Sequence, residues 1–465
     1  MMKFIKAFCF CLAFLVLNSF LFGQESIDDN MIKQFKEGVK DNAETRALRN
    51  AITNNDIKKL ALNRLNIDKV NHYFSNKVAT KGITNQKSSG RCWLFTGLNT
   101  IKPYVLKKYN INEFDFSQNY SFFWDQLEKS NLFLEGIIET RDKDLQDRKV
   151  EWLLKNPVGD GGQWTTFTDI IQKYGLIPKT AMPETNNSEN TRWMSRLINR
   201  KLREDAMKIR HMHKDGKGVN AIRTAKVKML SEIYRMLSLT LGEPPVEFTW
   251  QYKDKDGEIS KPKIYTPMSF YKEAIGVDLD NYIMFMNDPS REYYKLYEID
   301  LDRSVYDGKN WKYINLPINE IKEFTKLSII DNEALYFSCD VGKQLNTDEG
   351  TLDINNYDYG DLFGTTFGMD KKERIQTFES GSSHGMALIG FNEDDNGNID
   401  KWLLENSWGS DKGYKGYLTM TDKWFDEYMF RIVIDKKFVS EKILKILEEK
   451  PVMLPPWDPM FAPEE

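Results

Sequence analysis

A glutamine that stands six residues before a cysteine, at the start of an apolar helical stretch, constrains this chain more than any other feature. The segment reads Gln86-Lys87-Ser88-Ser89-Gly90-Arg91-Cys92-Trp93-Leu94-Phe95. A helix N-terminus lowers the pKa of a thiol, and the thiolate is the form that attacks a carbonyl carbon. Gln86 can supply a side-chain N–H that, with the backbone N–H of Cys92, would hold an oxyanion. The alternative interpretation is a buried structural cysteine, a common role of a cysteine outside disulfides.

A nucleophilic cysteine also needs a base and a group that orients the base. His384 lies in a turn of small residues that leads into an apolar strand, and Asn406 follows another apolar strand 22 residues later. Asn406 can accept a hydrogen bond from the imidazole, and Trp408 can shield that bond from water. The other histidines have no orienting neighbour in their local sequence. They are His72, in a segment expected to be helical, and His211 and His213, in a basic helical run. The predicted catalytic residues are therefore Cys92, His384, Asn406 and Gln86.

These residues resemble the papain superfamily and, within it, the bleomycin hydrolase and aminopeptidase C branch. The segments that carry the resemblance are 84–94, 160–164, 287–289, 340–343, 357–370 and 454–460. Ser89 stands where ordinary papain-like enzymes have a disulfide-bonded cysteine. His384 lies 292 residues after Cys92, whereas about 130–150 is usual. A large insertion therefore separates the two, as this branch requires.

The resemblance implies an α+β, papain-like fold of two lobes. A helical lobe would carry the cysteine, and a β-barrel-like lobe would carry the histidine and the asparagine. A large helical insertion and an extended C-terminal arm would complete the fold. Within a peptidase chain over 24–465, the expected segments are 81–185 for the helical lobe, 186–263 for the insertion and a hairpin, 264–449 for the strand-rich lobe and 450–465 for the arm.

The Asp160–Trp164 segment is expected to be a turn that enters a helix. In the resembled family a glycine-rich segment of this kind lines the cleft, so Gly161 and Gly162 would bind the substrate backbone, as would Trp408 beside the histidine. A plain turn without a binding role is the alternative.

Residues 1–23 have the pattern of a signal peptide, with lysines ahead of an unbroken apolar run from Ala7 to Leu17. We expect export to the periplasm or the cell exterior. A membrane anchor is the alternative if the leader is not cleaved, although the run is shorter than the roughly 20 residues of a span. Without the leader only Cys92 and Cys339 remain. Cys339 lies in an apolar strand-like run and is expected to be a packing residue, so we expect no disulfide.

Charge and composition limit the partners. The net charge of −4 argues against general nucleic-acid binding, which needs a basic surface. From Arg192 to Lys228 there are twelve Lys/Arg against three Asp/Glu. A solvated helical face or an oligomer interface is the simpler interpretation, with secondary nucleic-acid binding as a minor alternative. No metal-ligand spacing occurs, so neither a metal nor a cofactor is expected. The resembled family implies a homohexamer.

The C-terminal tail is rich in proline, with five of the fifteen prolines in its last sixteen residues. Such a segment is expected to be extended, and its apolar side chains argue against a tail left in water. In the resembled family this arm occupies the active-site cleft, and its terminal carboxylate, here that of Glu465, attracts the α-ammonium of the substrate. The bulkier ending from Phe461 onward departs from the family pattern.

The predicted function is that of a cysteine aminopeptidase acting on peptides with a free N-terminus. An exported papain-type endopeptidase with a displaced arm, and a non-catalytic binding protein on the same fold, are the alternatives.

Overall fold

The computed structural model describes residues 26–461. The predicted leader over 1–23 and the predicted substrate-binding residue Glu465 lie outside the described residues. Two contact units divide the described chain: one holds the residues up to Leu62 with Asp361–Phe363, and the other holds 63–360 and 364–461. Within 26–461, no helix is both long and apolar enough to cross a membrane.

The N-terminal unit consists mainly of three helices, α2 (Asp29–Gly38), α3 (Ala43–Asn54) and α4 (Ile57–Ala61). Each begins at a polar residue whose side chain accepts a backbone N–H of the first turn, which satisfies a donor that the helix cannot. Neither α2 nor α3 contains a buried residue. Apolar side chains of these helices are exposed: Ile32, Phe35 and Leu48.

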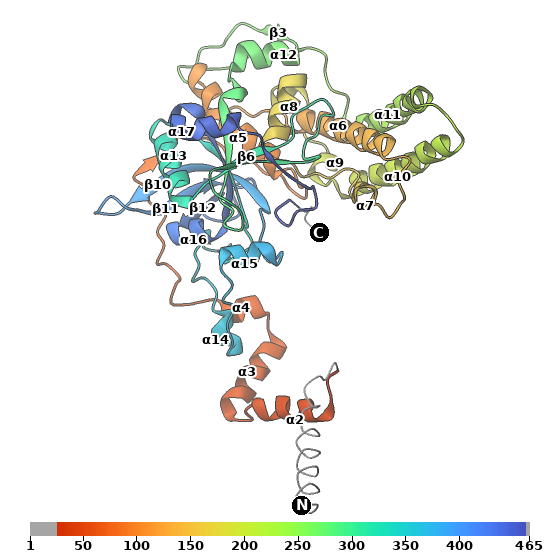
Figure 1. The fold of residues 1–465 in the computed structure, drawn as a ribbon. Coiled ribbons are helices and arrows are strands. Elements are labelled where there is room, and N and C mark those ends of the chain that lie inside the picture. Colours follow the sequence, from red (N-terminus) through yellow and green to blue (C-terminus); the bar gives the residue numbers. More distant parts are fainter. Residues whose placement is uncertain (1–25, 462–465) are drawn as a thin grey trace, which may run out of the picture. The chain divides into compact units, whose positions relative to one another are not determined.

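A mixed sheet of twelve strands forms the centre of the larger unit (Figure 1). Along the sheet the strands follow the order β14 (Val452–Leu454), β5 (Lys295–Ile299), β6 (Lys312–Asn315), β4 (Tyr282–Met286), β13 (Met429–Asp435), β7 (Leu335–Cys339), β10 (His384–Glu393), β11 (Ile399–Glu405), β12 (Tyr417–Thr421), β9 (Thr351–Leu352) and β8 (Leu345–Asn346). The short β1 (Asn76–Lys77) pairs with β10. A separate hairpin joins β2 (Phe248–Trp250) to β3 (Lys263–Tyr265).

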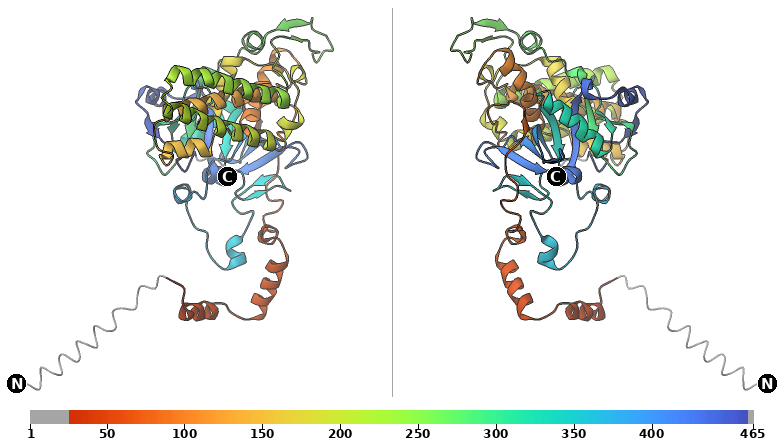
Figure 2. Two further views of the ribbon diagram at one scale, coloured as in Figure 1. Left: turned by 90° about the vertical axis from the view of Figure 1, so that its right-hand side faces the viewer. Right: turned by 90° about the vertical axis from the view of Figure 1, so that its left-hand side faces the viewer.

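The α-helices of this unit are α5 (Cys92–Lys108), α6 (Gln118–Glu139), α7 (Arg148–Lys155), α8 (Trp164–Tyr174), α9 (Asn186–Glu189), α10 (Arg192–Lys214), α11 (Val219–Leu241), α12 (Pro267–Ser269), α13 (Ile318–Ile330), α15 (Lys371–Gln376), α16 (Asp422–Tyr428) and α17 (Glu441–Leu444). Most residues of α14 (Tyr359–Phe363) belong to the N-terminal unit. α10 and α11 form a hairpin that packs on α6, as Figure 2 shows. They make up most of the predicted helical insertion.

Two hydrophobic cores lie on opposite faces of the sheet, because alternate side chains of a strand point to opposite sides. In β7, Tyr336 packs with α5, α6 and α8, whereas Leu335 and Phe337 pack in the second core with α13. The first core continues into α10 and α11. The sheet thus holds α5 on one face and α13 on the other.

Two local expectations differ from the structure. The segment around His72 was expected to be helical but is irregular, and its ring stacks on Tyr414 instead. The C-terminal arm is extended only over Val452–Leu454, where β14 pairs with β5. Beyond it the chain turns, with hydrogen bonds from Asp458 N to Pro455 O and from Phe461 N to Asp458 O. Proline fixes φ at values that also suit turns, so proline content alone does not make a segment extended.

Candidate active site

Cys92 is the first residue of α5 and is partly exposed. The residue before it, Arg91, is the N-cap and provides no side-chain cap for the helix. No cap side chain therefore bonds the backbone N–H groups of the first turn of α5, and these groups favour a negative charge beside Cys92. Cys92 and Cys339, the cysteines of the described segment, are not joined by a disulfide.

His384 and Asn406 meet because β10 and β11 are antiparallel neighbours. β10 begins at His384, and β11 ends one residue before Asn406, with Ala387 opposite Glu405. The start of one strand and the end of the next therefore lie at the same edge of the sheet. His384 Nε2 and Asn406 Oδ1 are 2.8 Å apart. An amide oxygen only accepts, so this contact places a proton on Nε2 and leaves Nδ1 as the atom that can take a proton.

The nucleophile helix packs directly on the strand that carries the histidine. Gly385 follows His384, and a Cβ added to this glycine would lie 3.2 Å from Thr96 Oγ1, one turn after Cys92. Burial raises the pKa of Cys339, which pairs in register with His384, and a charge on Cys92 adds to that rise. The close approach of α5 to the start of β10 therefore brings the predicted nucleophile and base to the same place.

The imidazole of His384 is removed from water. Its side chain is buried, and its ring stacks on Trp408 with a centroid distance of 4.8 Å. Burial lowers the pKa of His384 to about 4, and the hydrogen bond with Asn406 opposes this shift. An imidazolium here consequently needs an anion beside it, and the Cys92 thiolate is suited to that role because each charge would stabilise the other.

We expect Trp408→Ala to raise the pKa of His384 towards its ordinary value of 6.5, because water would reach the ring and reduce the cost of charging it. The measurement is an NMR titration of the histidine resonances in a Cys92→Ala background, where no thiolate contributes. His72, which bonds Thr419 and lies elsewhere, is the internal control. An unchanged pKa for His384 would mean that other side chains exclude the water.

Gln86 is held by two partners that fix the direction of its amide. Its Nε2 donates to the Ser89 carbonyl at 2.7 Å, and its Oε1 accepts from Ser407 Oγ at 2.7 Å. The Ser89 carbonyl can only accept, so the NH₂ group must face it. The second N–H of that group stays available for an oxyanion. The backbone supports the pairing, because Gln86 N donates to Ser407 O.

Ser407, which the sequence reasoning did not single out, hydrogen-bonds the predicted oxyanion residue Gln86. It lies between Asn406 and Trp408, both of which were predicted, so its proximity to the site could have been inferred. Its contact with Gln86 joins residues 321 positions apart, and no local sequence pattern predicts such a contact.

The predicted turn at Gly161 and Gly162 is tied to the nucleophile helix. α8 starts right after it, capped by Gln163. Trp93 Nε1 donates to the Asp160 carbonyl at 2.7 Å, and a Cβ on Gly162 would lie 2.7 Å from the Trp93 ring. A side chain at that position would therefore push the turn away from α5. Gly161 itself is exposed.

Lys129 holds the same turn in place by hydrogen bonds to its backbone carbonyl groups. Its ammonium donates to the carbonyls of Gly159 and Gly161 and pairs with the fully buried Asp125 at 2.7 Å. The Gly161 carbonyl is thus already occupied by a cation. This lysine was not predicted from the sequence, because it lies on α6, 32 positions before the turn that it bonds.

The C-terminal arm is anchored by side chains of the larger unit. Asp458 pairs with Arg291, and the Trp457 ring lies 4.6 Å from the Arg148 guanidinium carbon. Phe461 meets Trp311 edge to face at 4.9 Å. A Cβ on Gly381, three residues before His384, would lie 3.9 Å from the Pro459 carbonyl oxygen. The arm thus contacts the loop that leads into the histidine strand.

No group of His, Cys, Asp and Glu suited to hold a metal occurs within residues 26–461. The arrangement is that of a thiol at a helix N-terminus, an imidazole oriented by an amide, and a second amide whose direction is fixed by Ser89 and Ser407. Together these groups can perform nucleophilic acyl transfer.

Comparisons with known proteins agree with this chemistry. The model of the Peptidase C1-like family matches residues 26–461. Mouse bleomycin hydrolase is 42% identical over 424 residues, which cover 89% of this chain and 93% of the relative. Aminopeptidase C of Lactobacillus delbrueckii subsp. lactis is 37% identical over 94% of this chain and 97% of its own length. The crystal structure of PepW from Lactobacillus rhamnosis superposes with a TM-score of 0.91 at 38% identity, covering 94% of this chain and 99% of PepW. The chain therefore belongs to the Peptidase C1-like family.

Proposed function

We propose that this protein is a cysteine aminopeptidase that removes N-terminal residues from peptides. The observation that carries the proposal is the hydrogen bond between His384 and Asn406 at the edge of the sheet on which the Cys92 helix packs. The names of the relatives, bleomycin hydrolase and aminopeptidase C, support the same activity.

In the proposed mechanism the Cys92 thiolate attacks the carbonyl carbon of the first peptide bond. The oxyanion of the tetrahedral intermediate accepts hydrogen bonds from the Gln86 amide and the Cys92 backbone N–H. His384 gives its Nδ1 proton to the departing amine, and the C–N bond breaks to leave a thioester. Water, deprotonated by His384, then attacks the thioester and releases the amino acid and the thiolate. Asn406 keeps the imidazole in the required tautomer.

The backbone N–H of the exposed Gly161, the backbone of Gly162 and the Trp408 ring are the proposed substrate contacts. The arm is proposed to limit the site so that only the N-terminal residue of a peptide enters, with the terminal carboxylate of Glu465 near the α-ammonium. Its contact with the loop before His384 supports this placement. We also propose the papain-like division into a helical lobe and a strand-rich lobe with the insertion at 186–263, which the two separate hydrophobic cores support.

The experiment compares two fluorogenic substrates in reducing buffer, one with a free α-amino group and one that is N-acetylated. We expect cleavage of the free substrate and little of the acetylated one, because a blocked amine cannot pair with a carboxylate. Equal or better cleavage of the acetylated substrate would indicate an endopeptidase. Cleavage of neither would leave a binding protein.

Homohexamer assembly and export by a cleaved leader are proposed as well. The exposed apolar side chains of α2 and α3 support self-association, because such residues on amphipathic helices usually meet a partner. The mass in solution by light scattering tests the assembly. N-terminal sequencing of the protein from its native host tests removal of residues 1–23.

A further inference from the structure

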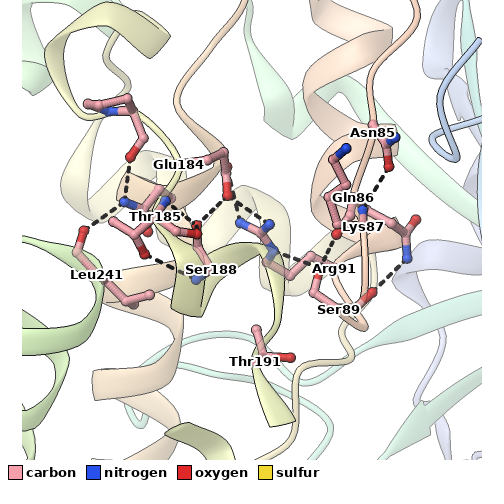
Figure 3. A network of polar contacts seen from close by, with 12 residues as sticks. Asn85, Gln86, Lys87, Ser89, Arg91, Glu184, Thr185, Ser188, Thr191 and Leu241 are labelled. Atoms are coloured by element: carbon pink, nitrogen blue, oxygen red, sulfur yellow. Dashed lines mark hydrogen bonds and ion pairs between the residues drawn. The ribbon is translucent and has the colours of Figure 1, made fainter. Parts of the chain in front are cut away.

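The residue just before the nucleophile carries a charge that never reaches the solvent. Arg91 has a fully buried side chain, and Figure 3 shows its guanidinium between Ser89 and Glu184. Its two terminal nitrogens bond both Glu184 oxygens, at 3.2 and 2.8 Å. The rings of Phe95 and Phe122 lie 5.2 and 5.3 Å from the guanidinium carbon. A bidentate pair between aromatic rings holds the group in one orientation.

The third guanidinium nitrogen, Nε, bonds the segment between Gln86 and Arg91. Arg91 Nε donates to Ser89 Oγ at 3.0 Å, so the Ser89 hydroxyl must use its own hydrogen elsewhere. It donates to the Gln86 carbonyl at 2.6 Å. The Ser89 carbonyl in turn accepts from the Gln86 amide. A continuous chain of hydrogen bonds therefore runs from Arg91 through Ser89 to the backbone carbonyl and the side-chain amide of Gln86.

The carboxylate end of the pair belongs to the segment that leads into the insertion. Glu184 also accepts from Ser188 Oγ at 2.5 Å, and Ser188 forms a capping box with Thr185 at the start of α9. Thr185 Oγ1 donates to the Thr240 carbonyl in the last turn of α11. The position of Glu184 is thus set by the start and the end of the helical part of the insertion, α9 to α11.

We infer that Arg91 is a positioning residue through which the docked insertion fixes Ser89 and, through Ser89, the oxyanion-binding amide of Gln86. Arg91 lies on the far side of Ser89 from Gln86, so it acts through its neighbours rather than on the substrate. This gives the insertion a role in catalysis in addition to any role in assembly. The inference rests on the proposed peptidase mechanism.

The test uses variants that separate the hydrogen-bond chain from the buried charge. Removing one partner of a buried ion pair leaves an uncompensated charge, whereas replacing both partners by apolar residues is often tolerated. The double variant Arg91→Met/Glu184→Met therefore removes both charges and the bond to Ser89. Ser89→Ala keeps the ion pair and removes only the hydroxyl. Arg374→Met/Glu427→Met is the matched control, because this ion pair also lies beside an aromatic ring, that of Tyr428, and bonds none of Gln86, Ser89 and Arg91.

Three readouts distinguish positioning from mere support of the fold. We expect kcat to fall about tenfold in the double variant and in Ser89→Ala, as one or two hydrogen bonds are lost. This is less than the roughly 10²–10³ expected for Gln86→Ala, which removes the donor itself. The inhibition constant of an aminoacyl aldehyde, whose adduct with Cys92 carries an oxyanion, should rise by about the same factor as kcat falls, with KM changed by less than about twofold. Alkylation of Cys92 by iodoacetamide, which forms no oxyanion, should keep its rate, and the control should match the wild type in all three.

A folded double variant with the kcat of the wild type would overturn the inference. So would a parallel fall in aldehyde binding and alkylation, because that would mean displacement of the whole segment rather than loss of one donor. Failure of the wild-type protein to cleave any peptide would refute the proposed function instead. The aldehyde and alkylation measurements need no turnover, so they still test the positioning role in that case.

Discussion

Cys92→Ala is expected to abolish peptide cleavage while the protein stays folded. The loss should be about 10⁵-fold or more, since removal of the nucleophile in a comparable triad hydrolase costs about 10⁶. Alanine is the best helix former, so α5 should still start at position 92. The measurement is kcat with the free-amine substrate, together with the thermal unfolding temperature.

Cys339→Ala is the matched control for this variant. Cys339 is a buried thiol at the end of β7, and burial raises its pKa, so it stays protonated and unreactive. We expect near wild-type turnover and a stability loss of about 1 kcal/mol, as is typical for a point change. Iodoacetamide should label the native protein that lacks residues 1–23 once, at Cys92. Labelling at Cys339, or substantial turnover by Cys92→Ala, would contradict the assignment of the nucleophile.

Deletion of residues 451–465 is expected to remove the preference for a free N-terminus. If the arm's carboxylate pairs with the substrate ammonium, losing it costs about 2–5 kcal/mol, or about 30-fold to several thousand-fold in discrimination. The measurement is the ratio of kcat/KM for the free and the acetylated substrate. A folded deletion variant that keeps the wild-type ratio would show that the arm does not set the specificity.

Two smaller changes show which part of the arm matters. Deleting 463–465 removes the two terminal glutamates and leaves the anchored part of the arm. This variant tests whether the negative charge of these glutamates strengthens the preference for a free N-terminus. An unchanged ratio would exclude that role.

Asp458→Asn weakens the pair with Arg291 while keeping the tail, and we expect an intermediate ratio because the tail would be held less firmly. For the deletion of 451–465, the unfolding temperature shows how much stability is lost when β14 leaves the edge of the sheet.

The residues of the candidate site were recognisable in the sequence because each has a local signature. Cys92 opens an apolar helix, and His384 opens an apolar strand. The 22-residue separation of His384 and Asn406 equals the length of a strand, a turn and a returning strand. An antiparallel hairpin of that length returns the chain to its starting edge, so their meeting could be predicted without knowledge of the rest of the fold.

The sequence alone therefore sufficed to predict the candidate nucleophile, base, orienting amide and oxyanion donor, because short-range patterns specify helix starts and strand ends. Only the tertiary structure decided what holds them. The contacts of Gln86 with Ser407, of Arg91 with Glu184 and of Lys129 with Gly161 join segments that are 32 to 321 positions apart. The low pKa of His384 likewise follows from burial beneath Trp408 and its neighbours. Such contacts depend on which elements pack together in three dimensions, and no periodicity within a single segment records that packing.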